Sequence, residues 1–235
     1  MKVFGELIEV EKLSEVSIKT MFMIMDAYYD QMTYLNFLND LREKDFCILI
    51  KDEIGRIQGF STQKLISFPL NDKVIHGVFS GDTIIDKNYW GSFELYKVFG
   101  KSFTKYCNLF PEFYWFLISK GYKTYKMLPL FFKIFYPNYS NPIPEYEKQV
   151  LDAFGHFKYP NIYNARIGVI EYPQGKDKLK DGVADITSKQ LKDKNIQFFL
   201  KSNPNYILGH DLVCLARLDT DNLKPTAKRL FVGEN

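Results

Sequence analysis

The chain has 235 residues, of which 46% are hydrophobic and 25% charged, and its formal net charge is +3 at pH 7. These values are typical of a globular protein of one or at most two domains, and so small a charge excess gives no support to nucleic-acid binding. The cysteines are widely spaced and the histidines have no partners at metal-ligand spacing, so the sequence predicts reduced thiols and no metal site. The N-terminus carries charges and no long apolar run, which predicts a cytoplasmic protein without a signal peptide or transmembrane segment.

The N-terminal part predicts two helices and three strands. Residues 14–29 carry apolar side chains at helical spacing behind a Ser14 cap, and residues 33–44 show the same spacing. Alternating side chains and intervening turn signals predict strands at residues 3–10, 45–51 and 56–68.

Residues 73–110 join a buried strand to a helix. Residues 73–85 are rich in apolar and β-branched side chains, which is typical of a strand buried on both faces. After a turn signal at residues 86–88, aromatic side chains recur every three or four positions up to Phe110. Because the backbone N–H groups at a helix N-terminus have no partner within the helix, this junction predicts a site for an anion such as a phosphate.

The sequence IIDKNYWG at this junction resembles the strand-to-helix junction of the GNAT superfamily of acyl-CoA N-acyltransferases. The matching positions are Ile85, Asp86, Tyr89 and Gly91, and the departures from the pattern are Trp90, Phe93 and Leu95. The resemblance implies an α/β fold (α+β mixed sheet) in which helices flank a central mixed sheet. The residues that correspond to the coenzyme A-binding loop are Ile84, Ile85, Trp90, Gly91 and Ser92. Large side chains stand where the family keeps its backbone bare, so we expect coenzyme A itself to bind weakly.

Beyond the helix, residues 113–118 (FYWFLI) are wholly apolar and predict a strand parallel to the central one. The resemblance implies that these two strands splay apart and admit the pantetheine arm of the acyl donor. Residues 137–144 are rich in Pro and Asn and mark a boundary. We therefore expect a GNAT-like portion at residues 1–139 and a C-terminal portion at 140–235, which completes the sheet and adds helices, within one compact domain. The remaining predicted elements are helices at 122–135 (interrupted by Pro129), 145–157, 188–201 and 223–230, and strands at 165–172 and 211–218.

Acyl transfer from a thioester to an amine needs hydrogen-bond donors for the oxyanion, a route for the amine proton, and an acid for the leaving thiolate. The resemblance implies a backbone N–H donor on the central strand, which corresponds to residues 83–85. Asp82 and Ser80, just before it, are candidate groups for accepting or relaying the amine proton, and a structural role is the competing interpretation. Phe132 stands where the family often has a tyrosine acid, so Tyr122 is the candidate acid, with aromatic packing as its alternative.

Three lysines recur at a spacing of four on the predicted helix: Lys97, Lys101 and Lys105. Three more follow soon after it in the chain: Lys120, Lys123 and Lys126. Such a stripe is most often a solvated face. The alternatives are a docking surface for an acidic acyl-carrier protein or for coenzyme A, and weak attachment to anionic lipid.

Two functions therefore remain open from the sequence. The first is a GNAT-like N-acyltransferase that moves an acyl group from acyl-CoA or an acyl-phosphopantetheine of a carrier protein to a small amine or amino acid, with no tightly bound cofactor. The second is a non-catalytic GNAT-fold module that binds an acyl or apolar ligand or a protein partner.

Overall fold

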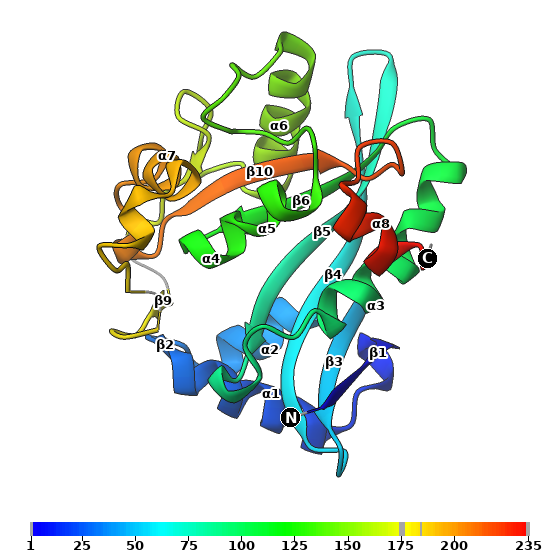
Figure 1. Ribbon diagram of the computed structural model, residues 1–235, viewed down its shortest axis with the longest axis vertical. Helices are drawn as coiled ribbons and strands as arrows, with labels where there is room; N and C mark the ends of the chain where they lie inside the picture. Colours follow the sequence, from blue (N-terminus) through cyan, green and yellow to red (C-terminus); the bar gives the residue numbers. More distant parts are fainter. Residues whose placement is uncertain (1, 174–176, 184, 234–235) are drawn as a thin grey trace.

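The computed structural model describes residues 2–173, 177–183 and 185–233, and at its centre these residues form a mixed sheet of eight strands (Figure 1). The order across the sheet is β1-β3-β4-β5-β6-β10-β8-β7, and β2 pairs separately with β9. The strands are β1 Val3–Glu9, β2 Tyr29–Asp30, β3 Phe46–Asp52, β4 Ile57–Leu70, β5 Lys73–Ile85, β6 Phe113–Ser119, β7 Tyr163–Asn164, β8 Val169–Ile170, β9 Lys178–Leu179 and β10 Asp211–Arg217. The pairing of β5 with β6 is parallel, and the other pairings within the described residues are antiparallel. The predicted fold class, a mixed sheet flanked by helices, is confirmed.

Helices cover both faces of this sheet (Figure 1). The α-helices are α1 Glu15–Tyr28, α2 Tyr34–Arg42, α3 Glu94–Phe103, α4 Tyr122–Tyr125, α5 Met127–Phe131, α6 Glu145–Lys158, α7 Lys194–Ser202 and α8 Pro225–Phe231. The short 3-10 helices are η1 Val10–Lys12, η2 Lys87–Tyr89, η3 Thr104–Asn108, η4 Gln190–Lys192 and η5 Tyr206–Leu208.

The two faces of the sheet have differently organised apolar cores. On one face a single cluster joins α3, α4, α5, α7 and α8 to strand residues such as Ile48 and Trp115. On the other face the core is split. One cluster lies under α6 and includes Phe116, and the other lies under α1 and α2 and includes Leu49. This split leaves a region between α6 and α2 that is not filled by either apolar cluster.

Local sequence signals explain the N-terminal elements. The Ser14 and Thr33 side chains accept hydrogen bonds from backbone N–H groups of the first turns of α1 and α2, as N-caps do. In the turn between β3 and β4, the Asp52 carboxylate accepts from the backbone N–H groups of Ile54 and Arg56. These helices and strands lie within about two residues of their predicted ranges, which is the usual uncertainty of an element boundary.

The central strand and its parallel partner are confirmed, but the connecting helix is shorter than predicted. Residues 77–80 of β5 are all buried, and β5 pairs in parallel with β6 from His76–Phe113 to Ser80–Leu117. The helix begins at Glu94, after the 3-10 turn η2 and a loop, rather than near Trp90. Gly91 in this loop has a φ of 95°, a left-handed conformation that interrupts a helix and that glycine adopts without strain.

Three predictions for the chain beyond β6 are wrong in extent. The predicted helix at 122–135 is two short helices, α4 and α5, because Pro129 has no N–H to continue the hydrogen-bond ladder and the chain becomes extended at Phe132. The predicted strand at 165–172 keeps only Val169 and Ile170, because Gly168 donates its N–H to Asn164 and folds the preceding residues into a tight hairpin with β7. The predicted helix at 188–201 is likewise divided into η4 and α7.

Cys47, Cys107 and Cys214 are free thiols. No helix in the described ranges has the length and apolar character needed to cross a membrane.

Candidate functional site

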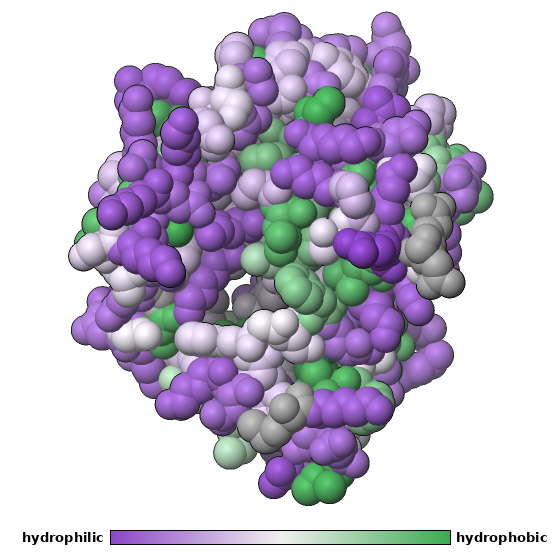
Figure 2. Space-filling model, in the orientation of Figure 1, coloured by the Kyte–Doolittle hydropathy of each residue, from purple (hydrophilic) through white to green (hydrophobic). Residues whose placement is uncertain are grey.

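A large cavity lies where the parallel strands β5 and β6 stop pairing. Their last paired residues are Ser80 and Leu117, and β5 then continues to Ile85 without β6 beside it. The cavity has a volume of about 730 Å³ and is lined from β5, the loop before α3, α4, α5 and the ends of α1, α2 and α6. Figure 2 shows a hollow left of the centre of this face, with mainly hydrophilic side chains on its left and a hydrophobic patch on its right.

A β-bulge in β5 forms the floor of this cavity. Ser61 of β4 pairs with Thr83 and Gln63 pairs with Ser80, so Thr62 faces two residues of β5, Gly81 and Asp82. The bulge aims Asp82 into the cavity, of which it is a lining residue.

Two backbone donors of β5 face the gap beyond the bulge. Asp86 donates its N–H to the Gln58 carbonyl of β4, and neighbouring residues of a strand point their hydrogen-bonding groups to opposite sides. The N–H groups of Ile85 and Thr83 therefore point away from β4, toward the space that β6 has left. The indole N–H of Trp90 donates to the Ile85 carbonyl at 2.8 Å, which fits this orientation.

One side of the cavity is built around the N-terminus of α3, and we call it the α3 wall. Its members are Ile84, Ile85, Trp90, Gly91, Ser92, Phe93, Tyr96, Lys123, Lys126 and Met127. The five residues predicted to bind coenzyme A thus all line the cavity. Trp90 folds back onto β5, and the Lys123 ammonium lies 3.5 Å from the centre of its indole ring. Lys123 also donates to the Val183 carbonyl at 2.7 Å, so this lysine joins the α3 wall to the segment that follows β9.

The three predicted catalytic residues do not share one environment. Asp82 and Tyr122 line the cavity. Ser80 is buried behind it in a small crevice, where its hydroxyl donates to Gln63 Oε1 at 2.7 Å and accepts from Trp115 Nε1 at 2.8 Å. These two hydrogen bonds commit the Ser80 proton and one lone pair to holding β4, β5 and β6 together at the start of the bulge.

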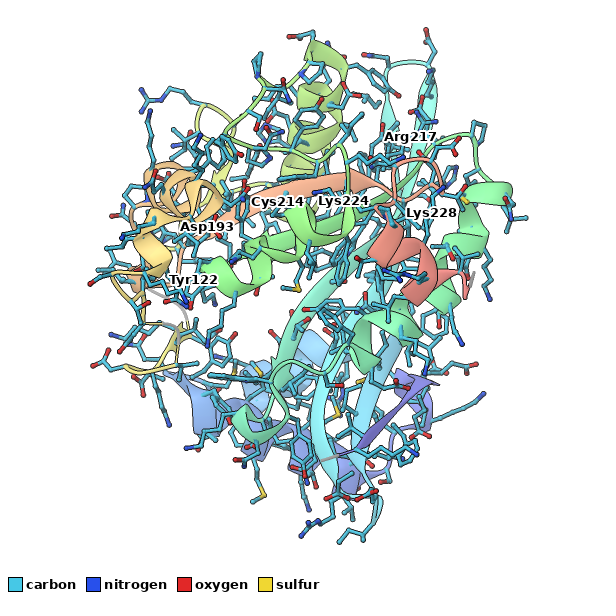
Figure 3. All side chains as sticks on the ribbon, in the orientation of Figure 1. Tyr122, Asp193, Cys214, Arg217, Lys224 and Lys228 are labelled. Carbon is cyan, nitrogen blue, oxygen red and sulfur yellow. The ribbon has the colours of Figure 1, made fainter. Side chains whose placement is uncertain are left out.

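The hydroxyl of Tyr122 is held in a defined orientation by Gln190 (Figure 3 shows Tyr122 at the first turn of α4). The Thr187 backbone N–H and hydroxyl both donate to Gln190 Oε1, at 2.8 and 3.1 Å, which fixes the amide orientation. Gln190 Nε2 therefore donates to the Tyr122 oxygen at 2.7 Å. Since the tyrosine oxygen accepts this bond, its own proton is available for donation to another group in the cavity.

Tyr96 was missed as a functional residue, because the sequence placed it only on the apolar face of α3. Its hydroxyl has no hydrogen-bond partner among the described residues, its ring packs on Phe131, and burial raises the pKa of the hydroxyl. Tyr96 lines both the cavity and the crevice below it. It is therefore a second neutral hydroxyl inside the cavity.

The opposite side of the cavity is polar and lies between the two apolar clusters of the second face. We call it the aspartate wall, and its members are Tyr29, Asp40, Lys44, Asp82, Lys120, Tyr159, Asp177 and Asp211. Burial, together with the charges of Asp82, Asp177 and Asp211, raises the pKa of the Tyr29 hydroxyl. Burial and the same kind of acidic surroundings hold the pKa of Tyr159 well above its usual range. These residues come from seven separate parts of the chain, so no local pattern in the sequence marked them.

Other candidates lie elsewhere. Phe132 is fully buried against Trp115, so the position aligned with the family tyrosine is part of the core. Lys120, Lys123 and Lys126 line the cavity, whereas the lysines of the predicted stripe on α3 are not among its lining residues. Lys97 is ion-paired with Glu94 instead. Within the described ranges no cluster of three or more His, Cys, Asp or Glu side chains is placed to hold a metal ion.

No protein-family model matches the sequence, and no curated protein matches it. Solved structures similar to this chain include a conserved protein from Enterococcus faecalis V583 described as a probable N-acyltransferase, with 10% identity and a TM-score of 0.42 over 54% of this chain and 32% of that one. A GNAT family N-acetyltransferase, YhbS from Escherichia coli in complex with CoA, has 10% identity and a TM-score of 0.36 over 51% of this chain and 65% of that one. An aminoglycoside acetyltransferase from an uncultured soil metagenomic sample, in complex with sisomicin, has 13% identity and a TM-score of 0.38 over 53% of this chain and 82% of that one. The chain thus spans less than two thirds of two of these three structures, and the similar structures include members of the superfamily that its strand-to-helix junction resembles.

Proposed function

We propose that the protein is an N-acyltransferase that moves an acyl group from a thioester to a small amine inside the cavity between β5 and β6. The observation that carries this proposal is the position of the cavity. It begins where the two parallel strands separate, directly beyond the bulge at Gly81 and Asp82, and it has a carboxylate on one side and an oriented tyrosine hydroxyl on the other.

Each requirement of the reaction has a group in this cavity. The amine nitrogen attacks the thioester carbonyl carbon, and the N–H groups of Thr83 and Ile85 stabilise the negative charge that develops on the carbonyl oxygen. Asp82 takes the proton of the attacking nitrogen. As the C–S bond breaks, Tyr122 gives its proton to the leaving thiolate sulfur, and proton exchange with water restores both residues.

Ser80 has a positioning role in this scheme. Its proton is committed to Gln63 and its oxygen accepts from Trp115 in a buried crevice, so it fixes the start of the bulge rather than touching the substrate. The α3 wall supplies the donor side. Lys123 and Lys126 give it positive charge, and backbone N–H groups at the start of α3 can receive a phosphate. The donor is proposed to be acyl-CoA or an acyl-phosphopantetheine.

The second candidate function is a binding module without catalysis. The observation that favours it is the placement of Trp90, whose indole is bonded to Ile85 and covered by Lys123 at the point where a pyrophosphate would approach the backbone. In that case the cavity binds an apolar or acylated ligand without turnover.

The test is release of free thiol and formation of amide when the protein is mixed with a labelled acyl thioester and a panel of amines. Both acyl-CoA and an acyl-carrier protein are offered as donors. Asp82→Asn and Tyr122→Phe are expected to lower the rate by about 10²-fold or more while retaining the fold. Tyr125→Phe is the matched control, because Tyr125 is buried and its hydroxyl donates to the Pro137 carbonyl outside the cavity. Retention of a bound acyl ligand without amide formation from any donor would favour the binding module.

A further inference from the structure

A row of polar side chains crosses the sheet behind the cavity, at the level of the bulge. Trp115 Nε1 donates to the Ser80 hydroxyl at 2.8 Å, and this hydroxyl donates to Gln63 Oε1 at 2.7 Å. Gln63 Nε2 then donates to the Ser61 hydroxyl at 2.7 Å. The Ser61 and Thr83 hydroxyls lie 2.7 Å apart and complete the row. We call these five residues the bulge network, and they join β4, β5 and β6.

The donors and acceptors in the first half of the bulge network all point one way. An indole N–H can only donate, so Ser80 accepts from Trp115 and keeps its own proton for another acceptor. With the amide oxygen of Gln63 toward Ser80, that proton has a partner. A flipped amide would leave the proton with no partner among the described residues, so the amide N–H of Gln63 faces Ser61.

The second half of the network ends on the bulge itself. Because Ser61 accepts from Gln63, its own proton is available for Thr83. The Thr83 hydroxyl in turn donates to the Gly81 carbonyl at 3.3 Å. This carbonyl belongs to the peptide bond between Gly81 and Asp82, so the network holds the orientation of the peptide that carries Asp82.

The bulge and the network depend on each other. Ser61 and Gln63 are two positions apart in β4 and therefore point to the same face of the sheet. Ser80 and Thr83 are three positions apart, and in a regular strand they would point to opposite faces. The extra residue of the bulge returns them to one face, where they stand opposite Gln63 and Ser61. A slip of one residue in the pairing of β4 with β5 would separate both pairs.

The network is buried at one end and reaches the cavity at the other. Gln63 and Ser61 have exposed fractions of 0% and 1%, and neither is among the described residues that line the cavity. Thr83 lines both the cavity and the crevice behind it. A buried polar network whose members are partnered is rigid and favours one geometry of the surrounding core. The chain of hydrogen bonds therefore connects the core rigidly to the floor of the cavity.

We infer that Gln63 and Ser61 are positioning residues of the acyl-transfer reaction. Through Thr83 and the Gly81 carbonyl they fix the Asp82 carboxylate and the Thr83 N–H group relative to each other, although neither lines the cavity. A misplacement of about 1 Å at such groups is enough to slow a reaction strongly. This inference rests on the proposed function and adds two residues that act on the same site from the core.

The first experiment compares two serines of β4 that each hydrogen-bond to a side chain of β5. Ser61 bonds to Thr83 at the bulge, and Ser67 bonds to His76 at 2.8 Å, nearer the other end of the two strands. Ser61→Ala is expected to lower kcat about tenfold or more, with KM for both substrates changed less than about twofold. Ser67→Ala is the matched control and should keep the kcat of the parent. An unchanged kcat in Ser61→Ala would overturn the inference.

Two further variants test whether the loss passes along the network. Ser61→Cys keeps a weaker donor of similar size, so its kcat should lie between those of the parent and Ser61→Ala. If the residues act through one chain of hydrogen bonds, Ser61→Ala/Ser80→Ala should lose no more activity than the worse of its two single variants. Additive losses would mean that the two serines act separately and would also overturn the inference. Circular dichroism and the melting temperature confirm that each variant is folded, and Ser61→Cys takes the place of Ser61→Ala if the latter is not.

The second experiment does not depend on catalysis. Crystal structures of the parent, Ser61→Ala and Ser67→Ala show whether the bulge has moved. In Ser61→Ala the peptide between Gly81 and Asp82 is expected to rotate and the Asp82 carboxylate to shift by about 0.5 Å or more, whereas Ser67→Ala should leave both in place. An unmoved bulge in Ser61→Ala would contradict the positioning role.

The outcomes separate this inference from the proposed function. A moved bulge and a lower kcat in Ser61→Ala support both. A moved bulge in a protein that releases no thiol from any acyl thioester supports the role of the network in fixing the bulge and contradicts the catalytic proposal. Acyl transfer by the parent, with kcat unchanged in Ser61→Ala, supports catalysis and overturns the positioning role.

Discussion

The two walls of the cavity are built in opposite ways. The α3 wall comes from two continuous segments, residues 84–96 and 123–127, and its charged members are lysines. The aspartate wall is assembled from the ends of α1, α2 and α6, the bulge of β5, the residue after β6, the segment at β9 and the start of β10, and its charged members are aspartates and lysines.

This contrast teaches that one cavity can have sides of different origin, one formed mainly by continuous segments of the chain and one formed only by tertiary packing. Each prediction below changes Tyr122, a residue of one wall or a residue that contacts a wall, and asks what else is affected.

The largest effect is expected for Tyr122→Phe, which removes the proposed acid and leaves the ring. The rate of acyl transfer should fall by about 10²- to 10⁴-fold with little change in amine affinity. Tyr96→Phe is the comparison, because Tyr96 places a second tyrosine hydroxyl in the cavity. Steady-state kinetics of both variants show which tyrosine is the acid. A large loss of acyl-transfer rate in Tyr96→Phe and a small loss in Tyr122→Phe would assign the role to Tyr96.

A smaller but clear effect is expected for Gly81→Ala at the bulge. A Cβ atom there would lie 2.7 Å from both Lys44 Cε and Thr62 Oγ1, so the aspartate wall must move. We expect a loss of about 1–3 kcal/mol in the free energy of unfolding and weaker amine binding, with donor binding unchanged.

Denaturant unfolding and calorimetry check the Gly81→Ala prediction. The double variant Gly81→Ala/Thr62→Ala removes one of the two short contacts, so part of the lost amine binding should return. Equal weakening of donor and amine binding would show that the two walls are not independent.

Trp90→Ala should act on the α3 wall in the favourable direction. Removing the indole uncovers the backbone near Ile85 and releases the Lys123 ammonium from the ring, so coenzyme A should bind more tightly, by up to about tenfold. Trp90→Phe keeps a ring for Lys123 but lacks the N–H donor. Comparing it with Trp90→Ala separates the effect of the ring's contact with Lys123 from the effect of the indole hydrogen bond to Ile85. Calorimetry with coenzyme A is the measurement, and unchanged or weaker binding in Trp90→Ala would show that the indole does not block the site.

The smallest effect concerns Asp193, which holds Lys126 of the α3 wall at 2.9 Å (Figure 3 labels Asp193). Burial acts to raise the pKa of this carboxyl, but hydrogen bonds from Lys126 and the Asn195 backbone N–H outweigh it, and the pKa is lowered. A carboxyl with a lowered pKa in the folded state stabilises the protein above its unfolded-state pKa, near 3.9. That stabilisation is lost as the pH falls through the folded-state value.

Asp193→Asn keeps an oxygen that can cap α7 and removes only the charge. At pH 7 it should cost less than about 1 kcal/mol, because the pair is partly exposed. Melting temperatures of the parent and variant should converge as the pH is lowered toward 3. A difference that stays constant over this range would mean that the ion pair contributes nothing.

The sequence determined most of the elements because their causes are local. The caps at Ser14 and Thr33, the turn at Asp52 and the β-branched run of β5 all act over a few residues, and each was placed within about two positions. The failures were also local in origin. Gly91 delays the start of α3, and Pro129 divides a predicted helix, because each changes the backbone at one position.

The residues of the candidate site also differ in whether local patterns in the sequence indicate them. The strand-to-helix junction brought Asp82 and the loop at Trp90 into consideration, and the absence of a tyrosine at Phe132 brought in Tyr122. The structure places all three around one cavity. The sequence did not reveal that Ser80 is committed to Gln63 and Trp115, since those contacts depend on neighbouring strands.

Only the tertiary structure decided the aspartate wall. Tyr29, Tyr159 and Asp211 are far apart in the chain and have no spacing in common, and they meet because β10 joins the sheet beyond β6 while α1 and α6 end on the same face. Local propensity fixes where a helix ends but not what the end faces. That is set by the packing of the two separate clusters under α6 and under α1 and α2, which leaves the space between them for charged side chains.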